Sequence, residues 1–156
     1  MTASEAFEAI RVFGEHEHRE LARGISQIHE AATFVGVASH VEVRRATRDI
    51  LAWAGTTLEP HLAWEETWLY PQIELATGTP WSTRAARFDH GQLAALIARL
   101  RLHEATASHL WTTTTTTELR FDLVALEALL RAHMEREERL LLPVLDELQH
   151  ESPPGP

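Results

Sequence analysis

Cysteine is absent from the sequence, and basic residues are scarce, with 14 Lys and Arg against 23 Asp and Glu. The lack of cysteine excludes disulfides, iron–sulfur clusters and thiolate zinc sites, so any metal ion must be bound through nitrogen and oxygen donors. A formal net charge of -9 opposes nucleic-acid binding, because neutralising phosphates requires a basic surface. We therefore expect small-molecule chemistry and no nucleic-acid partner.

The sequence also lacks the run of roughly 18 apolar residues that a membrane-spanning helix needs. Its first residues include Glu5 and Glu8 and do not have the basic start and apolar stretch of a secretory signal. We expect a soluble, cytoplasmic protein without a membrane partner. Glycine, proline and aromatic residues are few, whereas 44% of the residues are hydrophobic. This composition favours helices over a β-sandwich or barrel, and 156 residues can bury one full core.

Apolar periodicity predicts four long helices, at about residues 5–34, 40–75, 82–110 and 118–149. Pro60 lies inside the second of them and should bend it. The six threonines at 112–117 are poor helix formers and are typical of a polar connection. Short connections between amphipathic helices predict an all-α, up-down-up-down four-helix bundle over residues 1–150, with a disordered, proline-rich tail at 151–156.

One pattern of potential metal ligands occurs twice in the sequence, at a constant offset of 72 residues, as from His18 to His90. In each half, a histidine on the predicted apolar stripe is followed by a His-x-x-x-Glu motif on the next helix. Histidine and glutamate four residues apart lie about 40° apart around a helix, so both can reach one centre. The repeat predicts two pseudo-symmetric helical hairpins. The candidate metal ligands are His18, His61, Glu65, His90, His133 and Glu137.

Two carboxylates buried among apolar side chains would each cost several kcal/mol if they were unpaired. Either cations or an extensive hydrogen-bond network must compensate for this cost, and metal ions are the simpler explanation. A single histidine on an apolar stripe, or a single His-x-x-x-Glu motif, usually has a structural or surface role. Two copies in equivalent positions predict a dinuclear metal site. Imidazole and carboxylate ligands accept Fe, Mn, Zn or Co, so spacing leaves the metal open.

The repeated motifs resemble those of the hemerythrin-like (HHE cation-binding) family, in its stand-alone bacterial type. The matching stretches are HREL at 18–21, HLAWEETWLYP at 61–71, HGQL at 90–93 and HMEREERLLLP at 133–143. The resemblance implies a bundle with two Fe ions and an oxo or hydroxo bridge, in which Glu65 and Glu137 bridge the irons and the four histidines are terminal ligands. Ferritin-like bundles combine Glu-x-x-His motifs with a further Glu on each of the other helices, whereas here His precedes Glu by four residues and the other helices offer His.

The sequence departs from oxygen-carrying hemerythrins at Ala94, where they place a further histidine; its repeat counterpart is Ala22. The missing histidine would leave an open position on both irons, which favours reactivity over reversible oxygen carriage. The resemblance therefore implies reaction with H2O2, O2 or NO, foremost a catalase-like oxidoreductase that decomposes hydrogen peroxide under oxidative or nitrosative stress. The alternative is a non-catalytic module that binds or senses O2 or iron.

Residues beside the candidate ligands have structural interpretations. Glu66 and Glu138 should be solvated, because they lie well away from the histidines around the helix; the alternative is a water-mediated contact behind the ligands. Tyr70, the only tyrosine, should face away from the ligands in an ideal helix; if Pro71 distorts the helix and redirects it, the alternative is a redox or ligand role.

Trp64 and Trp68 flank His61 in a way that is typical of core packing. His16 should point away from the site that His18 faces. His29 lies roughly 16 Å farther along the same helix and should make a separate polar contact. His103 should lie on the surface or at a helix end.

Overall fold

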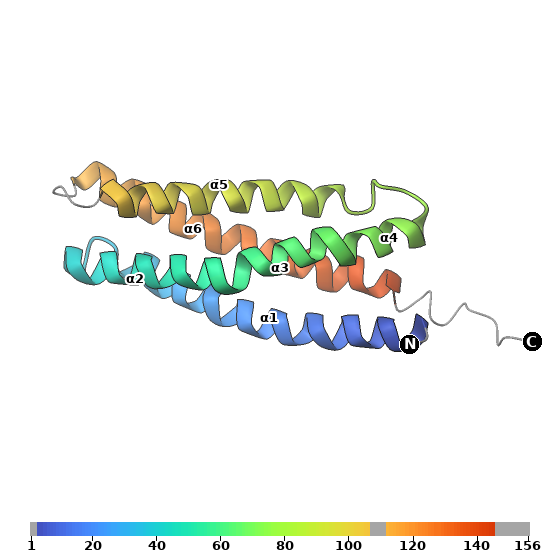
Figure 1. The fold of residues 1–156 in the computed structure, drawn as a ribbon. Helices are drawn as coiled ribbons and strands as arrows, with labels where there is room; N and C mark the ends of the chain where they lie inside the picture. The colour runs from blue at the N-terminus through green and yellow to red at the C-terminus, as the bar shows by residue number, and fades with distance from the viewer. Residues whose placement is uncertain (1–2, 107–111, 146–156) are drawn as a thin grey trace, which may run out of the picture.

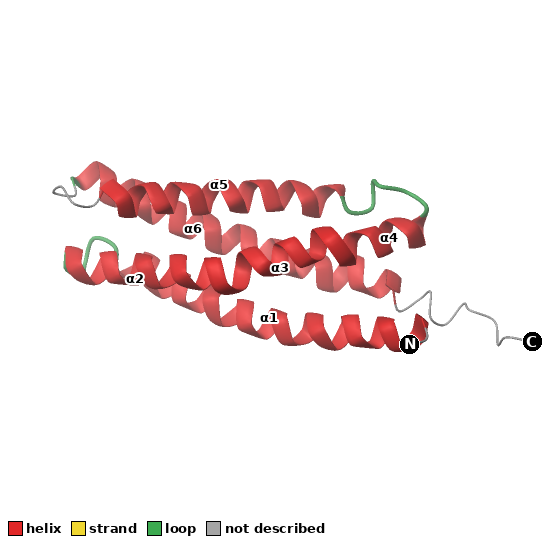
Figure 2. Ribbon diagram, in the orientation of Figure 1, coloured by secondary structure: helices red, strands yellow, loops and turns green. Residues whose placement is uncertain are grey.

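The computed structural model describes the backbone of residues 3–106 and 112–145, and within them the side chains from residue 18 onward. Four helical rods lie side by side and run alternately up and down (Figure 1). In the described residues every regular element is a helix, and loops join the first rod to the second and the second to the third (Figure 2). The predicted all-α four-helix bundle is confirmed. The tail at 151–156 lies outside the described residues.

The first rod is α1 (Ala3–Phe34). The second rod contains α2 (His40–Trp53), η1 (Ala54–Leu58), α3 (Glu59–Trp64), η2 (Glu65–Leu69) and α4 (Tyr70–Thr77), in which η1 and η2 are single π-helical turns. The third rod is α5 (Arg84–Thr106), and the fourth is α6 (Thr113–Arg136) followed by the π-helical turn η3 (Glu137–Leu141). Within these described elements, none is long and apolar enough to cross a membrane.

Each π-helical turn ends two residues before a proline, and the three prolines are Pro60, Pro71 and Pro143. Proline has no N–H, and its ring clashes with the carbonyl four residues earlier. In each turn, the residue before the proline instead donates to the carbonyl five residues earlier, as Tyr70 does to Glu65. This wider turn moves the carbonyl away from the ring. The bend expected at Pro60 therefore takes the form of a π-helical turn.

The π-helical turns shift which residues face the core after the two motif glutamates. An uninterrupted α-helix would place Trp68, which was predicted to pack in the core, and Leu140 on the buried stripe, but these residues are 61% and 63% exposed. Leu69 and Leu141, one residue farther along, are buried instead. The prediction was wrong because each turn contains one residue more than an α-helical turn, so the following segment is rotated about its axis.

The threonine run was predicted to be a connection, but α6 begins inside it. The hydroxyl of Thr112 accepts a hydrogen bond from the N–H of Thr115 at 3.2 Å and caps the helix. The Thr116 hydroxyl donates to the carbonyl of Thr112 at 3.0 Å. These bonds satisfy polar groups of the first turn and offset the low helix propensity of threonine. The last residues of the predicted third helix, 107–110, lie outside the described residues.

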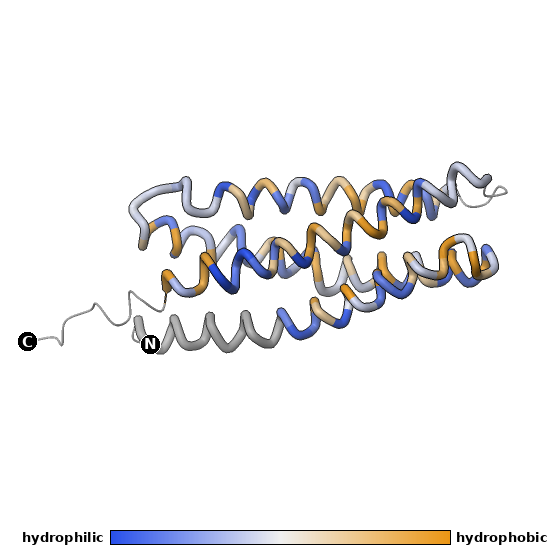
Figure 3. The backbone as a smooth tube through the Cα atoms, turned by 180° about the vertical axis from the view of Figure 1, so that it is seen from behind, coloured by the Kyte–Doolittle hydropathy of each residue, from blue (hydrophilic) through white to orange (hydrophobic). Residues whose placement is uncertain are grey.

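Two hydrophobic clusters of unequal size fill the bundle. The larger takes residues from all four rods, whereas the smaller lies at the end that carries α4 (Figure 1). Hydrophobic and hydrophilic residues alternate along the rods (Figure 3), as expected for helices with one buried stripe. Along the second, third and fourth rods, the candidate ligands lie between the two clusters. The smaller cluster consists of Leu69, Tyr70, Ile73, Ala86, Leu141 and Leu145, with Trp64 and Leu142 packed against it.

The close approach of α1 and α2 gives a testable consequence. A Cβ atom added to Gly24 would overlap the indole ring of Trp53, which packs against the larger cluster. Overpacking costs about 1–3 kcal/mol, which outweighs the gain of roughly 1 kcal/mol in helix propensity. We expect Gly24→Ala to lower the free energy of unfolding, measured by urea denaturation followed by circular dichroism.

The matched control is Gly91→Ala in α5, because a Cβ atom there would point into open space. This variant should raise the free energy of unfolding by about 0.5–1 kcal/mol. Equal stabilisation by both substitutions would show that Trp53 does not pack on Gly24.

Candidate metal centre

Six buried polar side chains meet in the layer between the two hydrophobic clusters. They come from α1, α3, η2, α5, α6 and η3, so every rod contributes. The structure brings together all the candidate ligands that the sequence predicts, and each is at most 8% exposed. They are His18, His61, Glu65, His90, His133 and Glu137.

The six residues form two overlapping groups, and both groups contain the same two glutamates. His18 and His61, the first histidine pair, belong to one group, and His90 and His133, the second histidine pair, belong to the other. Within each group one potential ligand atom per residue lies within 4.8 Å of all the others. The ring centroids are 5.5 Å apart in the first pair and 4.8 Å apart in the second, with similar interplanar angles of 66° and 68°. The predicted pseudo-symmetry is therefore visible in the site.

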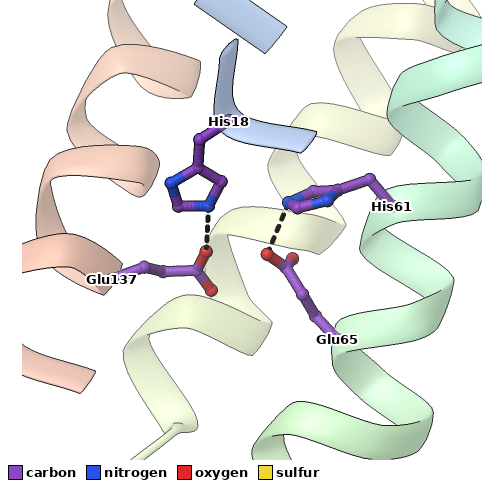
Figure 4. Close-up of side chains that lie close together, drawn as sticks. All are labelled: His18, His61, Glu65 and Glu137. Carbon is purple, nitrogen blue, oxygen red and sulfur yellow. Dashed lines mark ion pairs between the residues drawn. The ribbon is translucent and has the colours of Figure 1, made fainter. Parts of the chain in front are cut away.

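The Glu65 carboxylate directs one oxygen toward each histidine pair. Its Oε1 lies 2.6 Å from Nε2 of His61, and its Oε2 lies 3.1 Å from Nε2 of His90 and 3.5 Å from Nε2 of His133. Oε2 of Glu137 lies 3.5 Å from Nε2 of His18. Figure 4 shows His18 and His61 facing these two carboxylates from separate helices. This arrangement suits a carboxylate shared by two cations.

The polar atoms of the site are close together but poorly aligned for hydrogen bonds. Among the described residues, both oxygens of Glu65, Oε2 of Glu137 and both ring nitrogens of His133 have no well-aligned hydrogen-bond partner, although all are buried. Such groups would each cost a few kcal/mol if nothing else satisfied them. Their lone pairs are suited to cations, so the residues present fit a metal centre.

The two carboxylates differ in their electrostatic environments. Burial alone would raise the pKa of Glu65, but the imidazoles of His133, His61 and His90 outweigh it and hold the pKa well below its usual range. Burial raises the pKa of Glu137, and the nearby Glu65 carboxylate adds to this effect. Without a cation, the pair does not readily hold two negative charges.

The carboxylates of the site raise the pKa of two of the histidines. Burial would lower the pKa of His18, but Glu137 and Glu138 outweigh it and raise the pKa. The pKa of His133 is also raised, because Glu65 and Glu137 outweigh its burial. Histidine must be neutral to bind a metal, so protons and metal ions compete for this site.

Two further carboxylates contact the Nδ1 atoms of two histidines, on the side of the ring away from Glu65 and Glu137. Oε1 of Glu66 lies 2.9 Å from Nδ1 of His90, and Oε1 of Glu138 lies 3.1 Å from Nδ1 of His18. Solvation was predicted for both glutamates, with a water-mediated role behind the ligands as the alternative; Glu138 is indeed 55% exposed, but each glutamate contacts the histidine of the other half directly. Their offset of 72 residues was the available signal. A carboxylate on Nδ1 orients the ring and leaves Nε2 for a metal.

Charged residues that the sequence analysis did not single out complete this outer layer. Arg87 forms an ion pair with Glu66, and Arg136 forms one with the buried Asp89. Oδ2 of Asp89 lies 3.9 Å from Nδ1 of His133. Asp89 and Arg136 are on different helices, so their pairing depends on the packing of α5 against α6.

Tyr70 points into the site, contrary to the direction predicted for an ideal helix. The turn η2 rotates it inward, where it is fully buried. Its hydroxyl donates to Oε1 of Glu137 at 2.6 Å and lies 2.9 Å from Nε2 of His90. Burial and the two site carboxylates raise the pKa of Tyr70, so the hydroxyl keeps its proton in the absence of a cation.

The alanines that were expected to leave open positions lie elsewhere. Ala94 and Ala22 are both exposed to solvent, so neither side chain lines the buried layer. Tyr70 adds a hydroxyl at 2.9 Å from Nε2 of His90, in the second histidine pair. The expectation of an open position on each iron stays a prediction.

The remaining histidines and tryptophans have structural contacts. Nδ1 of His29 lies 3.0 Å from Oε2 of Glu127, which confirms a separate polar contact. Trp64 packs against the smaller cluster, as predicted, with its ring 6.4 Å from that of His61. His103 was predicted on the surface or at a helix end, and it lies in the last turn of α5. Its side chain is mostly buried there, with Nε2 3.0 Å from Oδ2 of Asp122 on α6.

The side chain of His16 lies outside the described residues, so its predicted orientation stays a prediction. A metal-ligand role for the six clustered residues also stays a prediction, because their geometry alone does not identify an ion.

Comparison with known proteins identifies one family. The family model described as the hemerythrin HHE cation binding domain matches residues 13–145, which is most of the chain and includes all six candidate ligands. The searches of curated proteins and of solved structures found no match.

Two glutamates on the same turn of the fourth rod allow the outer layer to be tested. Glu138 is 55% exposed and supports His18, whereas Glu135 is 58% exposed and pairs with Arg139. We expect Glu138→Ala to weaken metal binding by about 10-fold to 100-fold, because His18 loses the group that orients it. Competition with a chelator measures the affinity.

Glu135→Ala serves as the control and should bind metal as the parent protein does. If both variants kept the parental affinity, the contact between Glu138 and His18 would have no role in binding.

Proposed function

Because the chain belongs to the hemerythrin family of cation-binding domains, we propose that its six buried ligands hold two iron ions with an oxo or hydroxo bridge. We further propose that the loaded protein decomposes hydrogen peroxide. The observation that supports this proposal best is the sharing of both carboxylates by two histidine pairs. One ion could not use two groups of donors that face different sides of the same carboxylate.

The choice of iron follows from the family and agrees with the ligand chemistry. All six ligands are imidazole or carboxylate, and such donors suit iron as well as other first-row ions. Iron supplies a redox couple when it is bound. In the proposed reaction, one peroxide loses two electrons and two protons to give O2, and a second peroxide takes them up to give two water molecules. The reaction therefore needs no separate reductant.

The residues of the chain position the candidate metal ligands and limit the size of the molecules that can reach them. The two glutamates hold the histidine pairs at a fixed separation, and the outer carboxylates orient the rings. His18 and His90 are each 8% exposed, whereas the other four ligands are 0–2% exposed. Access through the edges of these two rings suits species as small as H2O2, O2 or NO and excludes larger substrates.

Iron loading tests the metal content. The protein should bind about two iron ions per chain after anaerobic loading, as measured by elemental analysis. Removal of the metal should lower the melting temperature by about 5–10 °C at a metal concentration 100 times the Kd, because a ligand that binds only the native state stabilises it. One ion per chain, or an unchanged melting temperature, would contradict the dinuclear site.

Oxygen evolution tests the reaction. Hydrogen peroxide added to the iron-loaded protein should release O2, and Glu137→Gln should lower the rate by about 10-fold or more, because it removes the charge of a shared ligand. His29→Ala is the control, since His29 is 63% exposed and pairs with Glu127, and it should retain the parental rate.

An O2 electrode and parallel iron analysis separate loss of chemistry from loss of metal. If the iron-loaded parent protein released no O2 from peroxide and bound O2 reversibly, the enzymatic proposal would fail in favour of a carrier or sensor.

A further inference from the structure

Tyr70 breaks the symmetry of the candidate metal centre. All six clustered ligands have a counterpart of the same type at an offset of 72 residues, but the counterpart of Tyr70 is Leu142. Leu142 packs as an apolar side chain against the smaller hydrophobic cluster. The second histidine pair therefore has a neighbouring phenol, and the repeat provides no equivalent hydroxyl for the first pair.

The position of the Tyr70 hydroxyl is fixed from several sides. The ring is fully buried in the smaller cluster and lies 5.2 Å from the ring of His90, at an interplanar angle of 29°. The Arg87 guanidinium lies 5.2 Å from the centroid of the tyrosine ring. The turn η2 sets the direction of the side chain, because it rotates residue 70 toward the core. The hydroxyl is therefore held in the site by packing as well as by its hydrogen bonds.

The distances around this hydroxyl match those between neighbouring ligands of one metal ion. First-row ions such as zinc bind nitrogen and oxygen at about 2.0–2.2 Å. Two ligands at a right angle then lie about 3 Å apart. The Tyr70 oxygen is 2.9 Å from Nε2 of His90 and 2.6 Å from Oε1 of Glu137, and both of these residues belong to the second group of candidate ligands.

We propose that Tyr70 is a ligand of the metal ion held by the second histidine pair, and that the two ions therefore have different protein ligands. This inference rests on the proposed function in taking that ion to be iron. The phenol proton is released when the metal binds, as it is from other acidic ligands. A cation beside the oxygen reverses the local electrostatics that otherwise keep the hydroxyl protonated.

Spectroscopy of the ferric protein tests this assignment without an activity measurement. A phenolate bound to ferric iron gives a visible charge-transfer band, and excitation in that band enhances the ring vibrations of the tyrosine in the resonance Raman spectrum. Tyr70 is the only tyrosine of the chain, so these signals have one possible source. We expect both signals from the iron-loaded parent protein and their complete loss in Tyr70→Phe, which keeps the ring and removes only the oxygen.

Trp64→Phe is the matched control, because Trp64 is the aromatic neighbour of His61 in the first histidine pair. This variant should keep the phenolate band. Iron analysis of each sample should still find about two ions per chain. A parent protein that binds two irons without phenolate signals would overturn the assignment of Tyr70 alone, whether or not the variants fold. A parent protein that binds no iron would instead overturn the proposed function.

Discussion

The burial of two carboxylates among apolar side chains is the constraint on which the rest of this structure depends. Glu65 and Glu137 are 0% exposed, and the desolvation of two neighbouring negative charges opposes folding unless positive charge or hydrogen bonds compensate. The four histidines surround these carboxylates, and further carboxylates and arginines support the histidines. The pseudo-symmetry of the chain follows from this requirement, because each hairpin supplies half of the buried charge and half of the groups that balance it.

The sequence was sufficient to predict the four-helix architecture and to identify the six residues that cluster in the core. Helical periodicity defined the four rods, and the 72-residue offset selected His18 over the other histidines of the first helix without any structural information. These features could be predicted because they depend on regular spacing. A repeat at equivalent positions of four amphipathic helices leaves few ways for the polar residues to meet, and the structure places them together.

The errors of prediction arose where the helices depart from the α-helical period. Trp68 was expected inside and Tyr70 outside, and the turn η2 reverses both. Proline was recognised as a source of distortion, but the sequence does not show whether the helix accommodates it with a kink or with a π-helical turn. Contacts across the bundle were also missed, such as Glu138 with His18, because they depend on the rotation of one helix against another rather than on spacing within either.

The division of the core by a polar layer bears on how metal ions enter and leave. The smaller cluster is separated from the larger one by the candidate ligands, so its attachment depends on the layer that the proposed metal ions would hold together. Local opening of this end costs less free energy than global unfolding, because fewer apolar contacts are broken. Such opening would uncover the carboxylates while the larger cluster stays packed. Exchange of the proposed metal ions would then need only a partial, reversible opening of one end of the bundle and not global unfolding.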